Sequence, residues 1–181
     1  RGGHTMPADR LYMDNTAGIS MLINDMLNRG KRRIGFVGNY NHCQSFFERY
    51  LAFRCAMMMA DVPVEKKYCI RTNHGSAAMQ VPPTYALDSY VVTSGNTISA
   101  TAHMKLKKLG KTVPEDVMLC GFDDSPESRI MSPALTTVHI HTQIMAFTAT
   151  HLLMSRIKEP SLDYRVVHTE ANLILRESTN F

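Results

Sequence analysis

Three groups of side chains in this sequence could perform chemistry. Asp123 and Asp124 could form an acid–base or metal-binding pair, but the side chains of consecutive residues project in different directions. His139 and His141 could share one face of a strand, yet no third metal ligand accompanies them. We therefore expect neither catalysis, nor a metal site, nor a cofactor.

The four cysteines are the third group, and their spacing also gives no indication of a metal or redox site. No two of them have the two-residue spacing of a zinc or redox motif, and a chain of 181 residues needs no disulfide framework. They are Cys43, Cys55, Cys69 and Cys120. We expect four reduced thiols in a cytoplasmic protein.

The composition is that of a globular protein with a sizeable core, because 44% of the residues are hydrophobic. No apolar run approaches the length of about 20 residues that a membrane span requires, and none follows Arg1 as in a secretory signal. The formal net charge is +4, with the basic residues mostly scattered, which is a weak indication of nucleic-acid binding.

Short apolar runs alternate with helical periodicity along the first two thirds of the chain. A helix follows Asp14 or Asn15 as its N-cap and ends at Gly30. Further helices are expected at 45–60, 76–80, 97–109 and 142–158, and strands at 33–38, 67–71, 89–93, 117–122, 135–140, 164–169 and 173–175. Strands separated by helices predict an α/β fold with a doubly wound, mainly parallel sheet.

Ligands of such sheets bind beyond the carboxyl ends of the strands. That rule directs attention to four segments, which are residues 38–45, 72–75, 94–97 and 123–126.

Five short motifs occur in order along the chain. They are Met13-Asp14-Asn15 with the later Gly30-Lys31-Arg32-Arg33-Ile34-Gly35-Phe36-Val37-Gly38; Arg49-Tyr50-Leu51-Ala52-Phe53; Val113-Pro114-Glu115-Asp116-Val117 leading to Gly121-Phe122-Asp123-Asp124; Pro133-Ala134-Leu135-Thr136-Thr137-Val138; and Leu175-Arg176-Glu177-Ser178-Thr179. Together they resemble the effector-binding region of LacI/GalR-type transcriptional regulators, although Ala52 replaces the glycine of the second motif.

The resemblance implies a partial two-lobed fold of the periplasmic binding protein-like type I, covering residues 1–181. Residues 14–122 would form most of the C-terminal sub-lobe, residues 123–160 would return into the N-terminal sub-lobe, and 161–181 would supply closing strands. Asp123 and Asp124 would fix hydrogen bonds at a crossover between the lobes. The family's DNA-binding headpiece and the first half of its N-terminal sub-lobe have no counterpart here.

Four residues are expected to contact a ligand. Arg49 would face the cleft, where its guanidinium could bridge sugar hydroxyls or bind a carboxylate. Asn96 stands where the family commonly has an aspartate, and could cap the following helix or contact the ligand. Ser45 could cap the helix at 45–60 and point into the cleft, and Asn73 follows the strand at 67–71.

The leading hypothesis is the small-molecule sensor of a repressor, binding a sugar or related metabolite. The resemblance also implies a homodimer, through the helix at 97–109, and contact with operator DNA only through the missing headpiece. A sugar-transport binding protein of the same fold is an alternative. A small flavodoxin-like enzyme is a further one, although the sequence has no glycine-rich phosphate loop or nucleophile motif.

Overall fold

The computed structural model describes residues 7–41, 43–72, 89–92 and 96–180. Six strands form one sheet in the order β3-β2-β4-β5-β6-β8, parallel except for the antiparallel β8. These strands are β2 (Ile34–Val37), β3 (Cys69–Ile70), β4 (Ser89–Val92), β5 (Met118–Asp123), β6 (Thr136–Ile140) and β8 (Ala171–Ile174). The predicted α/β fold with a mainly parallel sheet is confirmed.

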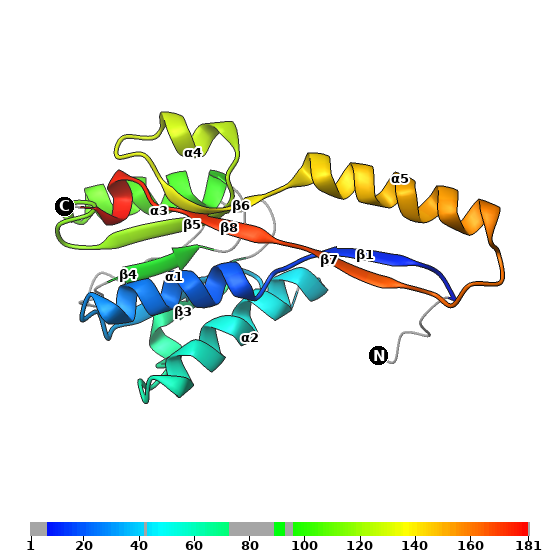
Figure 1. The fold of residues 1–181 in the computed structure, drawn as a ribbon. Coiled ribbons are helices and arrows are strands. Elements are labelled where there is room, and N and C mark those ends of the chain that lie inside the picture. The colour runs from blue at the N-terminus through cyan, green and yellow to red at the C-terminus, as the bar shows by residue number, and fades with distance from the viewer. Residues whose placement is uncertain (1–6, 42, 73–88, 93–95, 181) are drawn as a thin grey trace.

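Helices cover both faces of this sheet, as Figure 1 shows. On one face lie α1 (Ala17–Asn28) and α2 (Gln44–Met59), and on the other lie α3 (Asn96–Lys108) and the short α4 (Pro126–Ile130). The core is accordingly split in two, one cluster around Phe36, Phe53 and Phe122 and a second around Leu119 and Leu135. Burial on both faces explains why the strands read as continuous apolar runs.

The first helix ends where its sequence predicts, before Gly30, but its N-cap residue is Thr16 rather than Asp14 or Asn15. The Asp14 carboxylate accepts hydrogen bonds from the backbone N–H groups of Thr16 and Ala17, at 2.8 and 3.0 Å, and so caps α1. At the other end Gly30 has φ +78° and its N–H donates to the carbonyl of Leu27. Asp14 is therefore the capping side chain, and Asn15 is left for another role.

A projecting arm leaves this six-stranded body (Figure 1). It consists of β1 (Arg10–Met13), β7 (Val166–Thr169) and α5 (Thr142–Lys158), and β1 and β7 pair in parallel. Asp9 fastens its far end, because its carboxylate accepts from the Arg156 guanidinium at 3.0 Å and from the Arg165 backbone N–H at 2.8 Å. No residue of α5 is buried.

The boundary between body and arm differs from the one expected. The resemblance predicts that residues 123–160 return as a unit into the N-terminal sub-lobe, but β6 pairs with β5 over four residue pairs and lies inside the main sheet. The chain leaves the body after Ile140 rather than after Phe122. The reason is that Val138 is fully buried against α1, which fixes β6 in the sheet.

Other differences are smaller. The strand expected at 67–71 begins with a 3-10 turn, η1 (Lys66–Tyr68), and a second such turn, η2 (Glu177–Thr179), closes the chain. Neither β1 nor α4 was expected. The helix expected at 76–80 lies outside the described residues. None of the helices in the described segments is long and apolar enough to span a membrane.

Close packing of α1 on β6 gives a direct test. A Cβ atom on Gly18 would lie 2.5 Å from Cγ1 and 3.0 Å from Cγ2 of Val138. Gly18→Ala should therefore lower the free energy of unfolding by about 1–2 kcal/mol, although alanine favours a helix over glycine by about 1 kcal/mol. Urea denaturation measures this change.

The control is a double-mutant cycle with Val138→Ala, which removes the clashing methyl groups. The cost of Gly18→Ala should be smaller in the Val138→Ala background. Equal costs in both backgrounds would show that the helix does not pack on β6 at this point.

Candidate functional site

Polar side chains from three elements meet beyond the carboxyl ends of β5 and β6, where the body joins the arm. Arg49 comes from the second turn of α2, Asn15 from the segment that enters α1, and Asp123 from the last position of β5. The α/β rule for ligand sites predicts this edge of the sheet.

Arg49 is the centre of this cluster and is almost completely buried, with 2% of its surface exposed. Its Nε donates to Asn15 Oδ1 at 2.9 Å, and its Nη2 lies 3.5 Å from Met13 Sδ. The guanidinium carbon stands 3.5 Å from the centroid of the Phe122 ring, a cation–π contact. Burial lowers the pKa of Arg49 to about 10, opposed by the charge of Asp123, so the side chain stays protonated at neutral pH.

Asp123 is the carboxylate that faces this cation. Its Oδ1 lies 3.7 Å from Arg49 Nη2, and 38% of its side chain is exposed, against 3% for Arg49. Burial raises the pKa of the Asp123 carboxyl, and the charge of Arg49 opposes that rise. Its backbone has φ +90°, a conformation that turns the chain out of the strand. The accessible charge of the pair is therefore the carboxylate.

A chain of amide hydrogen bonds links Arg49 to Asn15, Glu48 and Gln44. Asn15 Nδ2 donates to Glu48 Oε2 at 2.9 Å, and Gln44 Nε2 donates to Glu48 Oε1 at 2.8 Å. Asn15 thus accepts from Arg49 with its oxygen and donates to Glu48 with its nitrogen. Asn15 lies in the segment that connects β1 of the arm to α1 of the body. Its hydrogen bond therefore links this connecting segment to Arg49.

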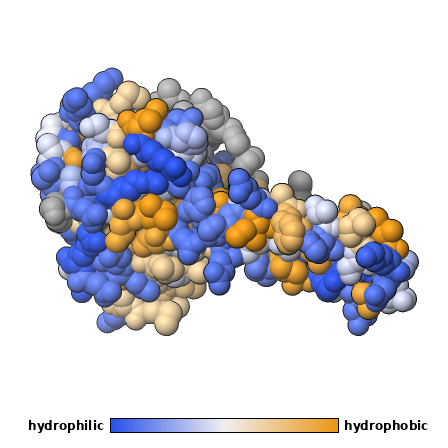
Figure 2. All heavy atoms as spheres, turned by 45° about the horizontal axis from the view of Figure 1, so that its top comes forward, coloured by the Kyte–Doolittle hydropathy of each residue, from blue (hydrophilic) through white to orange (hydrophobic). Residues whose placement is uncertain are grey.

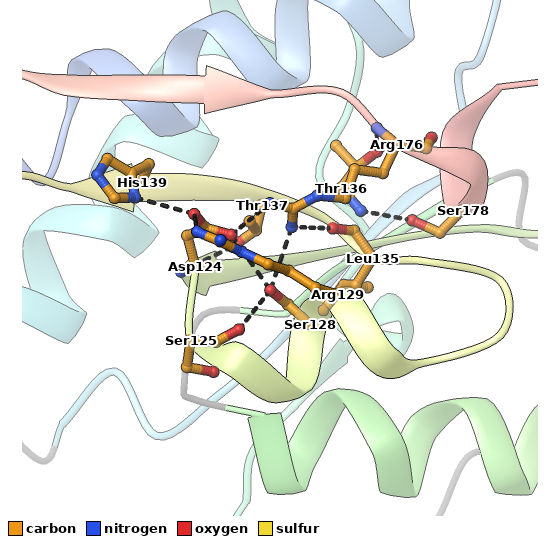
Figure 3. A network of polar contacts seen from close by, with 10 residues as sticks. All are labelled: Asp124, Ser125, Ser128, Arg129, Leu135, Thr136, Thr137, His139, Arg176 and Ser178. Atoms are coloured by element: carbon orange, nitrogen blue, oxygen red, sulfur yellow. Dashed lines mark hydrogen bonds and ion pairs between the residues drawn. The ribbon is translucent and has the colours of Figure 1, made fainter.

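Asp124 has a separate set of partners (Figure 3). Its carboxylate accepts from Arg176 Nη2 at 2.6 Å and from Arg129 Nη2 at 2.9 Å, and it contacts His139 Nδ1 at 2.9 Å. Desolvation opposes ionisation, but these partners lower the pKa of Asp124 to about 2. The network ties α4, β6 and the C-terminal segment together where the chain leaves the body.

His139 and His141 each have a hydrogen-bond partner from another residue. His139 contacts Asp124, and His141 is hydrogen-bonded to Asn172 on β8. Within the described residues, no group of three or more histidine, cysteine, aspartate or glutamate side chains could hold a metal ion.

The four predicted ligand contacts have different outcomes. Arg49 lies at the strand ends but is enclosed by protein groups. Ser45 is not the cap of α2, because the helix begins one residue earlier, at Gln44, with Cys43 as the cap residue. The Ser45 hydroxyl lies 3.1 Å from Cys43 Sγ. Asn96 is the first residue of α3, and Asn73 lies outside the described residues.

Sequence reasoning assigned Asp123 and Asp124 together to the crossover, and did not separate their roles. Only Asp124 forms the expected network of turn and crossover contacts, whereas Asp123 faces Arg49. The sequence signal for this site is that residues 123–126 follow the carboxyl end of a predicted strand. Asn15 was considered only as a helix cap.

The pattern of the periplasmic binding protein-like domain matches residues 23–179. The chain belongs to this family. The resemblance to the effector-binding region of LacI/GalR-type regulators is likewise confirmed.

Known relatives of this periplasmic binding protein-like chain are transcriptional repressors. It is 28% identical over 158 residues to the HTH-type transcriptional repressor PurR of Pectobacterium carotovorum subsp. carotovorum (strain PC1), an alignment covering 84% of this chain and 46% of the relative. It is 23% identical over 176 residues to the ribose operon repressor of Haemophilus influenzae (strain ATCC 51907 / DSM 11121 / KW20 / Rd), covering 94% and 53%. The chain spans about half the length of the curated relatives it matches.

A solved structure shares the fold. The transcriptional regulator CelR in complex with cellobiose superposes with a TM-score of 0.85 at 23% identity, covering 95% of this chain and 54% of that one.

The role of Asn15 can be tested by truncation. Asn15→Ala removes the acceptor of Arg49 and the donor to Glu48 inside a largely buried cluster, so it should lower the free energy of unfolding by about 1–3 kcal/mol. Asn39→Ala is the matched control, because within the described residues Asn39 accepts a long, exposed contact of 3.4 Å from Arg71. Equal losses by chemical denaturation would contradict the assignment.

Low pH should destabilise the folded state by protonating Asp124. Because its pKa is lower in the folded state, its stabilisation of about 2 kcal/mol is complete above about pH 4 and is lost as the pH falls towards 2. Asp124→Asn should remove this part of the pH dependence in urea titrations.

Its two arginine partners provide the control. Arg176 has 16% of its side chain exposed and Arg129 has 61%, so Arg176→Lys should cost more stability than Arg129→Lys. The reverse order would contradict the network.

Proposed function

We propose that this chain is the small-molecule-sensing region of a LacI/GalR-type transcriptional repressor, and that its effector binds beside Asp123 and Arg49. The observation that carries the proposal is the position of this charged pair. It lies at the carboxyl ends of the strands, next to the crossings between body and arm. A ligand at such a place touches both parts of the chain.

The arm is proposed to be part of a second lobe, with the body as most of the C-terminal sub-lobe. Hydrophobic side chains gather on the arm in Figure 2. Five exposed ones lie on α5, namely Ile144, Phe147, Leu153, Met154 and Ile157. A helix with so much exposed apolar surface is expected to pack against further structure, and curated relatives are about twice as long as this chain.

Signal transmission would use the crossings between the two parts. The chain passes between arm and body near Asn15, His141 and Glu170. Effector binding would favour one orientation of the lobes, because only differential affinity for two states can shift their populations. In the complete protein, a homodimer in the cytoplasm would transmit this shift to operator DNA through a separate headpiece.

A carbohydrate is the effector class that we favour. Among the proteins compared, one is named a ribose operon repressor and another was solved with cellobiose. Sugar hydroxyls can donate to the Asp123 carboxylate, and the polar side chains of Asn96, Asn73 and Ser45 are proposed as further contacts. A reaction on the sugar is not part of the proposal.

Isothermal titration calorimetry of the full-length gene product against neutral mono- and disaccharides tests this function. One sugar should bind saturably, and Asp123→Asn should weaken its binding about tenfold or more, because a charged acceptor is replaced by a neutral one. Asp61→Asn is the matched control, since Asp61 is an exposed aspartate at φ +54° beyond the end of α2. Absence of binding heat for every sugar would contradict the proposal.

A further inference from the structure

The charges around the candidate site are not balanced. Arg49 is the buried cation among the described residues of this cluster, and the Asp123 carboxylate lies 3.7 Å from it. The second carboxylate, that of Glu48, is linked to Arg49 through Asn15, which accepts from Arg49 and donates to Glu48. The hydrogen bonds to Glu48 come from Asn15 and Gln44, which are neutral amides and cancel no charge. The cluster formed by Arg49, Asp123 and Glu48 therefore carries one excess negative charge.

The cation is also the less accessible member of the pair. Phe122 covers the guanidinium on one face and Asn15 accepts from its Nε, which leaves 3% of the Arg49 side chain exposed. Asp123 keeps 38% of its side chain exposed. A molecule approaching the strand ends thus meets a carboxylate before it meets the arginine.

The neighbouring arginines that the structure describes do not reverse this sign. Arg176 and Arg129 bind the Asp124 carboxylate, and Arg129 belongs to α4, on the opposite face of the sheet from α2 (Figure 1). Arg71 follows β3, three strand positions from β5, which corresponds to about 14 Å across the sheet. At that separation, the attraction between an exposed arginine and a ligand anion is largely screened by salt.

From this arrangement we infer that the site selects an uncharged ligand rich in hydrogen-bond donors and rejects phosphorylated sugars and other anions. The inference rests on the proposed function and narrows its ligand class. The Asp123 carboxylate accepts ligand hydroxyl or N–H groups. Arg49 acts as a positioning residue that contacts this carboxylate from the buried side. A phosphate would have to displace Asp123 from Arg49 and remain beside two carboxylates.

Inorganic phosphate tests the sign of the site without knowledge of the effector. Titrated into the ¹⁵N-labelled 181-residue chain at constant ionic strength, it should cause no saturable shift of the backbone amide signals of Arg49, Phe122 or Asp123. In Asp123→Asn, which retains a residue that tolerates positive φ, phosphate should bind about tenfold more tightly at these positions. Asp61→Asn removes the same charge elsewhere and should leave these signals unchanged.

Saturable phosphate binding at Arg49 in the unmodified chain would overturn the inference. An Asp123→Asn chain that still rejects phosphate would overturn the assignment of the rejection to Asp123.

Matched ligand pairs separate this inference from the proposed function. D-Ribose is compared with D-ribose 5-phosphate, D-glucose with D-glucose 6-phosphate, and adenine with adenosine 5′-monophosphate, by calorimetry on the full-length gene product. In any pair that binds, the uncharged member should bind at least about tenfold more tightly. Tighter binding of a phosphorylated sugar would overturn the inference but would leave the proposed sensor function intact. Rejection of phosphate without binding of any sugar would contradict only the proposal of a carbohydrate sensor.

Discussion

The structure depends on how one buried cation is accommodated. Removing a guanidinium from water costs several kcal/mol unless the protein returns equivalent contacts. Arg49 receives them from the ring of Phe122, the amide oxygen of Asn15 and the carboxylate of Asp123. These partners belong to β5 and to the entry of α1, so one side chain on α2 fixes the relation between three elements at the ligand-binding edge of the sheet.

The adjacent aspartates illustrate how position decides the role of a residue type. Asp123 is partly exposed beside one arginine, and burial raises its pKa. Asp124 is enclosed by two arginines, a histidine and the Ser128 hydroxyl, and the arginines and the histidine lower its pKa despite desolvation. Both have positive φ, which points their side chains away from the regular alternation of the strand. The first is available to a ligand and the second secures the crossing.

Much of the fold could be predicted from local signals. Buried parallel strands need apolar runs on both faces, and Gly30 and Asp14 mark the limits of α1. The element β1 could not be predicted in this way, since its four residues are only partly buried and gain their partner from β7, far along the chain. The boundary after Ile140 likewise depends on a packing contact between Gly18 and Val138.

The candidate site was less predictable for the same reason. Sequence motifs located Arg49, but its enclosure by Phe122 and Asn15 is a property of three segments brought together by folding. Hydrogen exchange of the Arg49 side-chain Nε–H, followed by NMR on arginine-labelled chain, tests this enclosure most directly. We expect this proton to exchange much more slowly than that of the exposed Arg54 on the same helix. Equal exchange rates for the two arginines would show that the Arg49 guanidinium is open to solvent, and would contradict the account.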